Sequence, residues 1–122
     1  MIVQLRRRER RYRDLSPDRP YVVIGIEADH LRMLNDDGRP FLYPARLFRI
    51  IDRREPEDWI SEIGDEGERY AYAPPLNGVG FFEDFFEGNK RAVRTFWRAV
   101  NDRLAAAPAK APSSRTTNSS RA

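Results

Sequence analysis

The sequence contains no cysteine and a single histidine, His30, among its 122 residues. Disulfides, thiolate metal sites and sites built from several histidines are therefore excluded. No apolar run is long enough to span a bilayer, and the first apolar residues precede Arg6-Arg7-Arg8, which reverses the order in a signal peptide. We expect a cytoplasmic protein with no membrane association and no cofactor.

Motifs that carry catalysis are also missing, including the Walker loop, G-x-G-x-x-G, G-x-S-x-G and H-E-x-x-H. Histidine often serves as a general base, but no serine or threonine lies near His30 in the sequence to act as a nucleophile. A surface histidine beside a turn is the favoured interpretation. The sequence therefore predicts that the protein is not an enzyme and has no catalytic residues.

Charge is abundant and unevenly distributed, with 34% charged residues and a net charge of +3. Residues 1–20 hold seven arginines against three acids, a local charge of +4. Residues 52–68 hold eight acids against two arginines, a local charge of −6. A long nucleic-acid duplex would be attracted by the first region and repelled by the second.

Short apolar and β-branched segments dominate the first half. Strands are predicted at residues 1–5, 21–26, 30–34, 41–43 and 48–52, with a single helical turn at 45–47. Asp37-Gly38 predicts a hairpin turn, and Gly25 predicts a bulge or a close approach of another residue. A lone helical turn before the last of several short strands is typical of an SH3-like barrel.

The second half predicts a strand and helix extension. A helix is expected to begin at Pro56, followed by a turn at 65–67, a strand at 69–72 and a short helix at 81–87. Asn89 is the expected N-cap of an amphipathic helix over 90–104. The predicted fold class is α+β, mainly β, with one domain over residues 1–104 and a disordered tail over 105–122.

Four segments resemble a family of small uncharacterised bacterial proteins. They are YVVIGIE at 21–27, LRMLNDDG at 31–38, FLYPARLFRIID at 41–52 and GFFEDFFEG at 80–88. The resemblance implies an SH3-like barrel and supplies no catalytic residues. Because such proteins are often encoded near toxin and phage-defence genes, it also implies an immunity-type or other interaction role.

The leading hypothesis is a non-catalytic protein-binding module in which an acidic surface meets a basic partner protein and exposed aromatic residues anchor the contact. The predicted partner-binding residues are Trp59, Glu62, Asp65, Glu66, Tyr72, Glu83, Asp84 and Glu87. A solvated face and a divalent-cation site are the other interpretations of the acids in residues 52–68.

The alternative hypothesis is a small nucleic-acid-associated protein that uses its arginine-rich N-terminal segment. Arginines would follow the phosphates while Tyr12 stacks on bases. The predicted residues are Arg6, Arg7, Arg8, Arg10, Arg11, Tyr12 and Arg13. Protection of a strand edge by charge explains the same residues without any ligand.

Overall fold

The computed structural model describes the backbone of residues 1–110 and the side chains of residues 1–103. Two compact units make up the chain, and the boundary between them lies between Asn77 and Gly78. The single domain predicted over residues 1–104 stays a prediction. None of the described helices is both long and apolar enough to cross a membrane.

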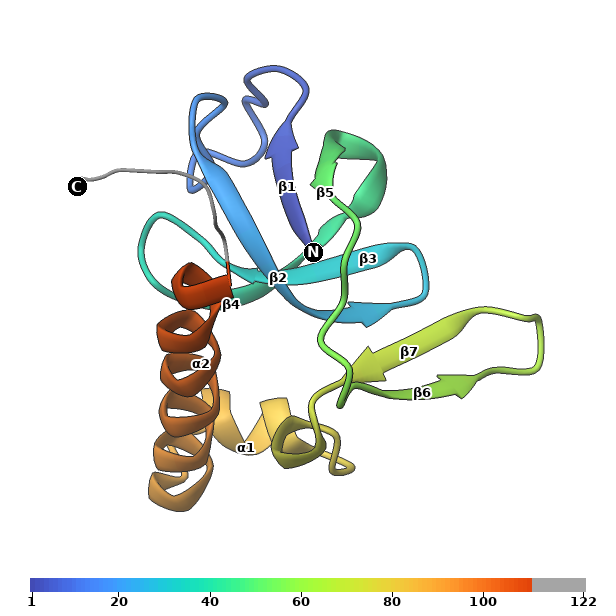
Figure 1. Cartoon of the computed structure of the whole chain (residues 1–122), viewed down its shortest axis with the longest axis vertical. Helices are drawn as coiled ribbons and strands as arrows, with labels where there is room; N and C mark the ends of the chain where they lie inside the picture. The colour runs from blue at the N-terminus through green and yellow to red at the C-terminus, as the bar shows by residue number, and fades with distance from the viewer. Residues whose placement is uncertain (111–122) are drawn as a thin grey trace. The chain divides into compact units, whose positions relative to one another are not determined.

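The first unit is an antiparallel sheet of seven strands (Figure 1). The strands are β1 (Ile2–Leu5), β2 (Pro20–Glu27), β3 (His30–Leu34), β4 (Pro40–Pro44), β5 (Phe48–Asp52), β6 (Ile60–Ile63) and β7 (Arg69–Tyr72). Five of them follow the order β4-β3-β2-β1-β5, while β7 pairs with β2 and β6 pairs with β7. Since β4 and β5 do not pair within the described residues, the sheet is open, and the barrel stays a prediction.

Strand β2 organises the sheet because it is long enough to hold two neighbours along one edge. Its first half pairs with β1 and its second half pairs with β7, while β3 follows its other edge. The β2–β3 register shifts between Val23 and Gly25, and a Cβ added at Gly25 would lie only 1.9 Å from Cε1 of Tyr72. The predicted bulge and the predicted close approach are both confirmed at Gly25.

The core of this unit follows the two-residue period of its strands, in which alternate side chains point to one face. Its innermost residues include Val3, Val23, Met33 and Ala71, each exposed by 2% or less. Leu15, in the connection between β1 and β2, is equally buried. A 3-10 helix, η1 (Ala45–Leu47), joins β4 to β5 and places Leu47 in the same core, which confirms the predicted helical turn.

The segment after β5 differs from its prediction. The expected helix at Pro56 is only one turn, closed by a hydrogen bond of 3.3 Å from the Trp59 amide to the Pro56 carbonyl, and β6 begins at Ile60. The helix prediction was therefore wrong, because acids after a proline mimic a helix start while Trp59 packs against the sheet core. A short 3-10 helix, η2 (Pro74–Leu76), follows β7.

The second unit contains α1 (Phe81–Phe86) and α2 (Lys90–Lys110). The Ala92 amide donates to Oδ1 of Asn89 at 3.0 Å, which confirms the predicted N-cap. Phe96 is fully buried, and the ring centroid of Phe85 lies 4.7 Å from its own. Because α2 reaches Lys110, residues 105–110 are helical, and the remainder of the predicted disordered tail lies outside the described residues.

Candidate interaction surfaces

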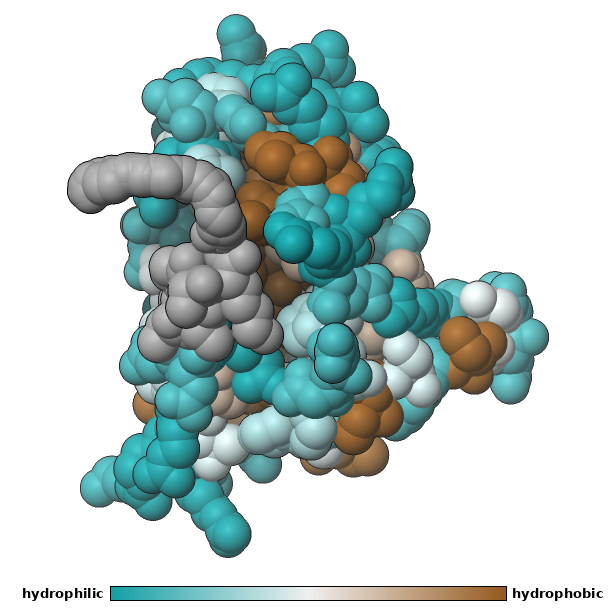
Figure 2. Space-filling view, in the orientation of Figure 1, coloured by the Kyte–Doolittle hydropathy of each residue, from teal (hydrophilic) through white to brown (hydrophobic). Residues whose placement is uncertain are grey.

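The β6–β7 hairpin projects from the rest of the first unit (Figure 1). All four residues of β6 are exposed, including Ile60 at 41% and Ile63 at 66%. Tyr70 on β7 is exposed at 37%. Figure 2 shows an apolar spot on this hairpin within a hydrophilic surround. Apolar side chains therefore lie on both strands of an otherwise polar hairpin.

The hairpin also carries three of the acids that the sequence predicted to be exposed. Glu62, Asp65 and Glu66 are all exposed, and the register places Glu62 directly opposite Tyr70. Asp65 and Glu66 occupy the turn, which Gly67 closes with a positive φ of 82°. The hairpin thus combines negative charge with exposed apolar area. Within the described residues, no group of three carboxylate or histidine side chains forms a possible metal site.

Tyr72 does not belong to the exposed surface, so the prediction that it anchors a partner is wrong. Its side chain is only 6% exposed, and its hydroxyl donates to Oε2 of Glu27 at 2.6 Å. Arg32 is also only 6% exposed, and its Nε donates to the same hydroxyl at 2.7 Å. Burial raises the pKa of Tyr72 above its ordinary value. Tyr72 therefore fastens β7 to the sheet.

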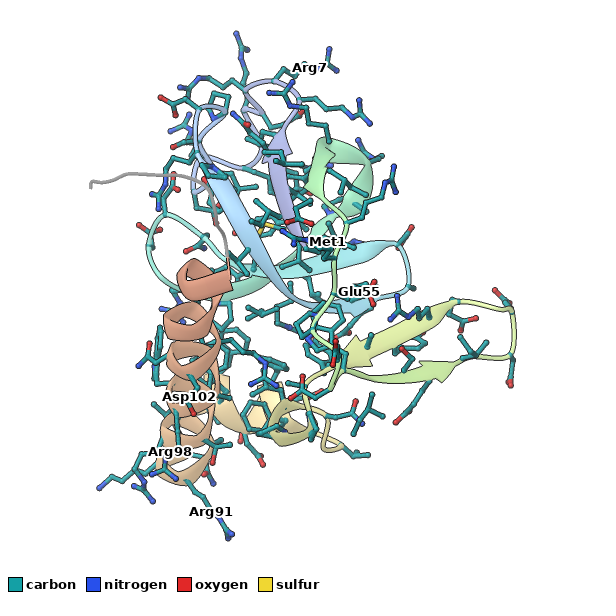
Figure 3. All side chains as sticks on the ribbon, in the orientation of Figure 1. Met1, Arg7, Glu55, Arg91, Arg98 and Asp102 are labelled. Atoms are coloured by element: carbon teal, nitrogen blue, oxygen red, sulfur yellow. The ribbon has the colours of Figure 1, made fainter. Side chains whose placement is uncertain are left out.

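Trp59 is half-buried against the core rather than free in solvent. The connection that carries it is held by Glu55, which accepts two hydrogen bonds from the Arg69 guanidinium at 2.6 and 2.8 Å. These bonds lower the pKa of Glu55 below its ordinary value. The ammonium of Met1 donates to the Arg54 carbonyl at 2.5 Å, so the same connection is also tied to β1 (Figure 3).

The remaining predicted acids lie in the second unit. Glu83, Asp84 and Glu87 are exposed on and directly after α1. They form a separate acidic cluster, defined by its own helix rather than by the sheet.

The arginine-rich segment is an exposed connection between β1 and β2. All six of its arginines are exposed. Arg7 makes an ion pair of 3.6 Å with Glu9, and the other five arginines have no ion pair within the described residues. Figure 3 shows Arg7 among side chains that point outward at this end of the sheet.

Two further arginines join this segment in the fold. The Arg6 amide donates to the Leu47 carbonyl at 3.0 Å, which brings Arg46 of η1 beside it. Gln4 pairs with Arg49 of β5 in the register of β1 and β5. Sequence reasoning missed Arg46 and Arg49, because only the pairing of distant strands makes them neighbours of the segment.

Tyr12 is half-buried, so only part of its ring faces solvent, and base stacking by this residue stays a prediction. Its ring meets Tyr43 edge to face, with centroids 5.5 Å apart, and it packs against the core. An open depression of about 460 Å³ lies beside it. Three arginines and three aspartates line this depression with Tyr12: Arg10, Arg11, Arg13, Asp14, Asp36 and Asp37. Opposite charges therefore offset one another there.

Comparison with known proteins places no relative beside this chain. No protein-family model, curated protein or solved structure matches it. The resemblance to small bacterial proteins therefore stays a prediction, and the surfaces described above carry the functional inference.

Proposed function

We propose that this chain is a non-catalytic protein-binding module whose β6–β7 hairpin binds a basic partner protein. One observation carries the proposal: Ile60 and Ile63 are exposed on an edge strand that is surrounded by carboxylates. Exposed apolar area often marks an interaction site. Opposite charge on a partner would speed its approach and select it against acidic competitors.

At the level of the fold, we propose a relationship to SH3-like barrels. The order β5-β1-β2-β3-β4, with η1 between β4 and β5, supports it. Within that frame the partner is a basic toxin, and this chain acts as an immunity-type protein in the cytoplasm. It would block the toxin by covering a surface, which requires shape and charge but no chemistry on either protein.

The test compares two double charge reversals with the same change in net charge. Glu62→Lys with Glu66→Lys alters the hairpin, whereas Asp18→Lys with Asp37→Lys alters exposed positions elsewhere in the first unit. Tagged wild-type and variant chains are used to capture proteins from the native host. Captured proteins are identified by mass spectrometry, and binding is then measured with the purified partner.

The hairpin variant is expected to lose the partner while the control variant keeps it. Equal capture by the two variants would refute the acidic-hairpin interface. Reversal of Glu83 and Glu87 in a third variant measures whether the acidic cluster of the second unit takes part.

Nucleic-acid binding is the second candidate, favoured by the way Arg46 and Arg49 extend the cluster of exposed arginines. The contact would be mainly with phosphates, because the ring of Tyr12 is half-buried against Tyr43. Affinity for duplex DNA should then fall steeply as salt rises. The logarithm of the binding constant, plotted against the logarithm of the salt concentration, should have a slope of about −0.9 per phosphate contacted.

The matched variants for this candidate remove three arginines from each of two surfaces. Arg6→Ala, Arg8→Ala and Arg46→Ala act on the cluster, while a control replaces the exposed Arg91, Arg94 and Arg98 of α2. Figure 3 labels Arg91 and Arg98 of this control surface. Loss of affinity only in the first triple variant supports a site. Equal loss in both would mean that net charge alone attracts the DNA.

A further inference from the structure

We propose that β6 binds its partner by strand addition, with an extended basic segment of the partner protein pairing along the outer edge of β6. This inference rests on the proposed function and specifies how the hairpin would bind. No other described strand pairs with that edge, since β6 has β7 as its single neighbour. An exposed strand edge presents unpaired amides and carbonyls that can template another strand.

The register shows which backbone groups of β6 point outward. The Gly64 amide donates to the Glu68 carbonyl at 2.8 Å across the hairpin, so hydrogen-bonded pairs alternate from that position. Glu62 with Tyr70 and Ile60 with Tyr72 are then the bonded pairs of the ladder. The amide and carbonyl groups of Ser61 and Ile63 consequently face away from β7, toward the open edge.

The opposite strand of the hairpin confirms this alternation. The Ala28 amide donates to the Arg69 carbonyl at 2.8 Å, so Arg69 directs its backbone toward β2 and away from its opposite residue, Ile63. In each strand of the hairpin, alternate residues therefore direct their backbone groups to opposite edges. Both edges of β7 are paired with another strand, whereas only one edge of β6 is.

Side chains of β6 define what the incoming strand should carry. Ile60 and Glu62 lie on one face of the strand, and Ser61 and Ile63 lie on the other, because neighbouring residues alternate. A lysine or arginine placed opposite Glu62 and a β-branched residue opposite Ile63 would form favourable cross-strand pairs. The fitting ligand is an extended segment in which basic and β-branched residues alternate.

Charge argues against a second copy of this chain as the occupant. Pairing two β6 strands would bring Glu62, Asp65 and Glu66 of both copies together, and facing like charges are destabilising. The same carboxylates attract a basic segment. Exclusion of self-pairing and selection of a basic partner thus follow from one set of residues.

A second edge strand with exposed apolar residues, β5, does not fit the same ligand. Ile50 and Ile51 are exposed at 43% and 52%, and Figure 2 shows apolar area over β1 and β5. The β1–β5 register shifts beside Ile51, an irregularity that disrupts pairing. The exposed Arg49 and Arg53 would also repel a basic strand.

The test uses a fluorescent, end-capped peptide of alternating valine and lysine as the probe, with binding followed by anisotropy at low salt. Ile63→Pro removes the outward backbone N–H. The matched Ile63→Val keeps this N–H and has a side chain of similar size to proline. Since the Ile63 amide is not part of the β6–β7 ladder, proline at this edge leaves the hairpin paired. Ser61→Pro against Ser61→Ala repeats the comparison, and circular dichroism verifies folding of all four variants.

Strand addition predicts that Ile63→Pro weakens probe binding roughly tenfold relative to Ile63→Val. A probe with N-methylated backbone amides should bind more weakly in the same way. Equal affinity of the proline and valine variants at both positions, with binding still abolished by reversal of Glu62 and Glu66, would overturn strand addition and leave the acidic interface intact.

Three further results are decisive. Unchanged probe binding after that charge reversal would count against the acidic interface itself. Failure of the wild-type chain to bind the probe would overturn strand addition, while partner capture decides the proposed function separately. A wild-type dimer that Ile63→Pro converts to monomer would show that a second copy occupies the edge, which also overturns the proposal.

Discussion

Gly25→Ala is expected to destabilise the first unit because Tyr72 occupies the space that a methyl group needs. The added Cβ would lie 1.9 Å from Cε1 and 2.4 Å from Cδ1 of that ring. The ring cannot swing away freely, since its hydroxyl donates to Glu27 and accepts from Arg32. Gly25 does not have a positive φ, so the backbone itself accepts alanine and the whole penalty is steric.

The size of the effect follows from two contributions. Overpacking a filled site costs about 1–3 kcal/mol. Displacing the Tyr72 hydroxyl weakens its two hydrogen bonds, with Glu27 and with Arg32. A hydrogen bond with a charged partner is worth about 1.5–3 kcal/mol. Taking the lower part of each range and subtracting about 0.5–1 kcal/mol for the better strand propensity of alanine leaves roughly 3 kcal/mol. For a unit of this size each kcal/mol lowers Tm by about 4–8 °C, so we expect Tm to fall by about 12 °C or more.

The assay is thermal and urea unfolding followed by circular dichroism, arranged as a double-mutant cycle with Tyr72→Ala. Without the ring, Gly25→Ala should be neutral or slightly stabilising. An equal loss of stability in both backgrounds would refute the steric reasoning. Gly67→Ala is the control, because nothing lies within 4 Å of its added Cβ and only its positive φ is strained, at about 1–2 kcal/mol.

Two other predictions concern single hydrogen-bonded contacts. Arg69 lowers the pKa of Glu55 below its usual 4.5, so the stability advantage of wild type over Glu55→Gln should be complete above that pH and vanish as the pH falls through the lower, folded-state pKa. Melting temperatures across the acid range check this, and an advantage that persists at the acid end would contradict it. Asn89→Ala removes the cap on the Ala92 amide and should cost about 1 kcal/mol, whereas Asn89→Asp should retain most of it; urea unfolding of the two variants distinguishes them.

Strands with one buried face could be predicted from the sequence, because alternation of residue type follows alternation of burial. Val3 and Leu5 point into the core while Gln4 lies between them, half-exposed. Strand β6 gives no such signal, since all four residues are exposed. Its position is decided by pairing with β7 and by the bond from Arg69 to Glu55, neither of which leaves a periodic pattern.

Exposed charge could also be predicted, but the burial of aromatic residues could not. Glu62 and the arginines before Tyr12 are exposed as expected. Tyr72 is buried because Gly25, far away in the sequence, leaves room for its ring. Tyr12 is half-buried by its contact with Tyr43. Each exception depends on a tertiary neighbour rather than on the local residue pattern.

The exposure of β6 is not a sign that the hairpin lacks order. An isolated two-stranded hairpin is marginally stable in water, so the order of this one comes from β7, where Ala71 is fully buried and Tyr72 is fastened to Glu27. Natural proteins usually protect such an edge with charge or cover, yet Ile60 and Ile63 leave apolar area there. A binding role explains that combination, because an edge held rigid before contact loses little conformational freedom when a partner strand arrives.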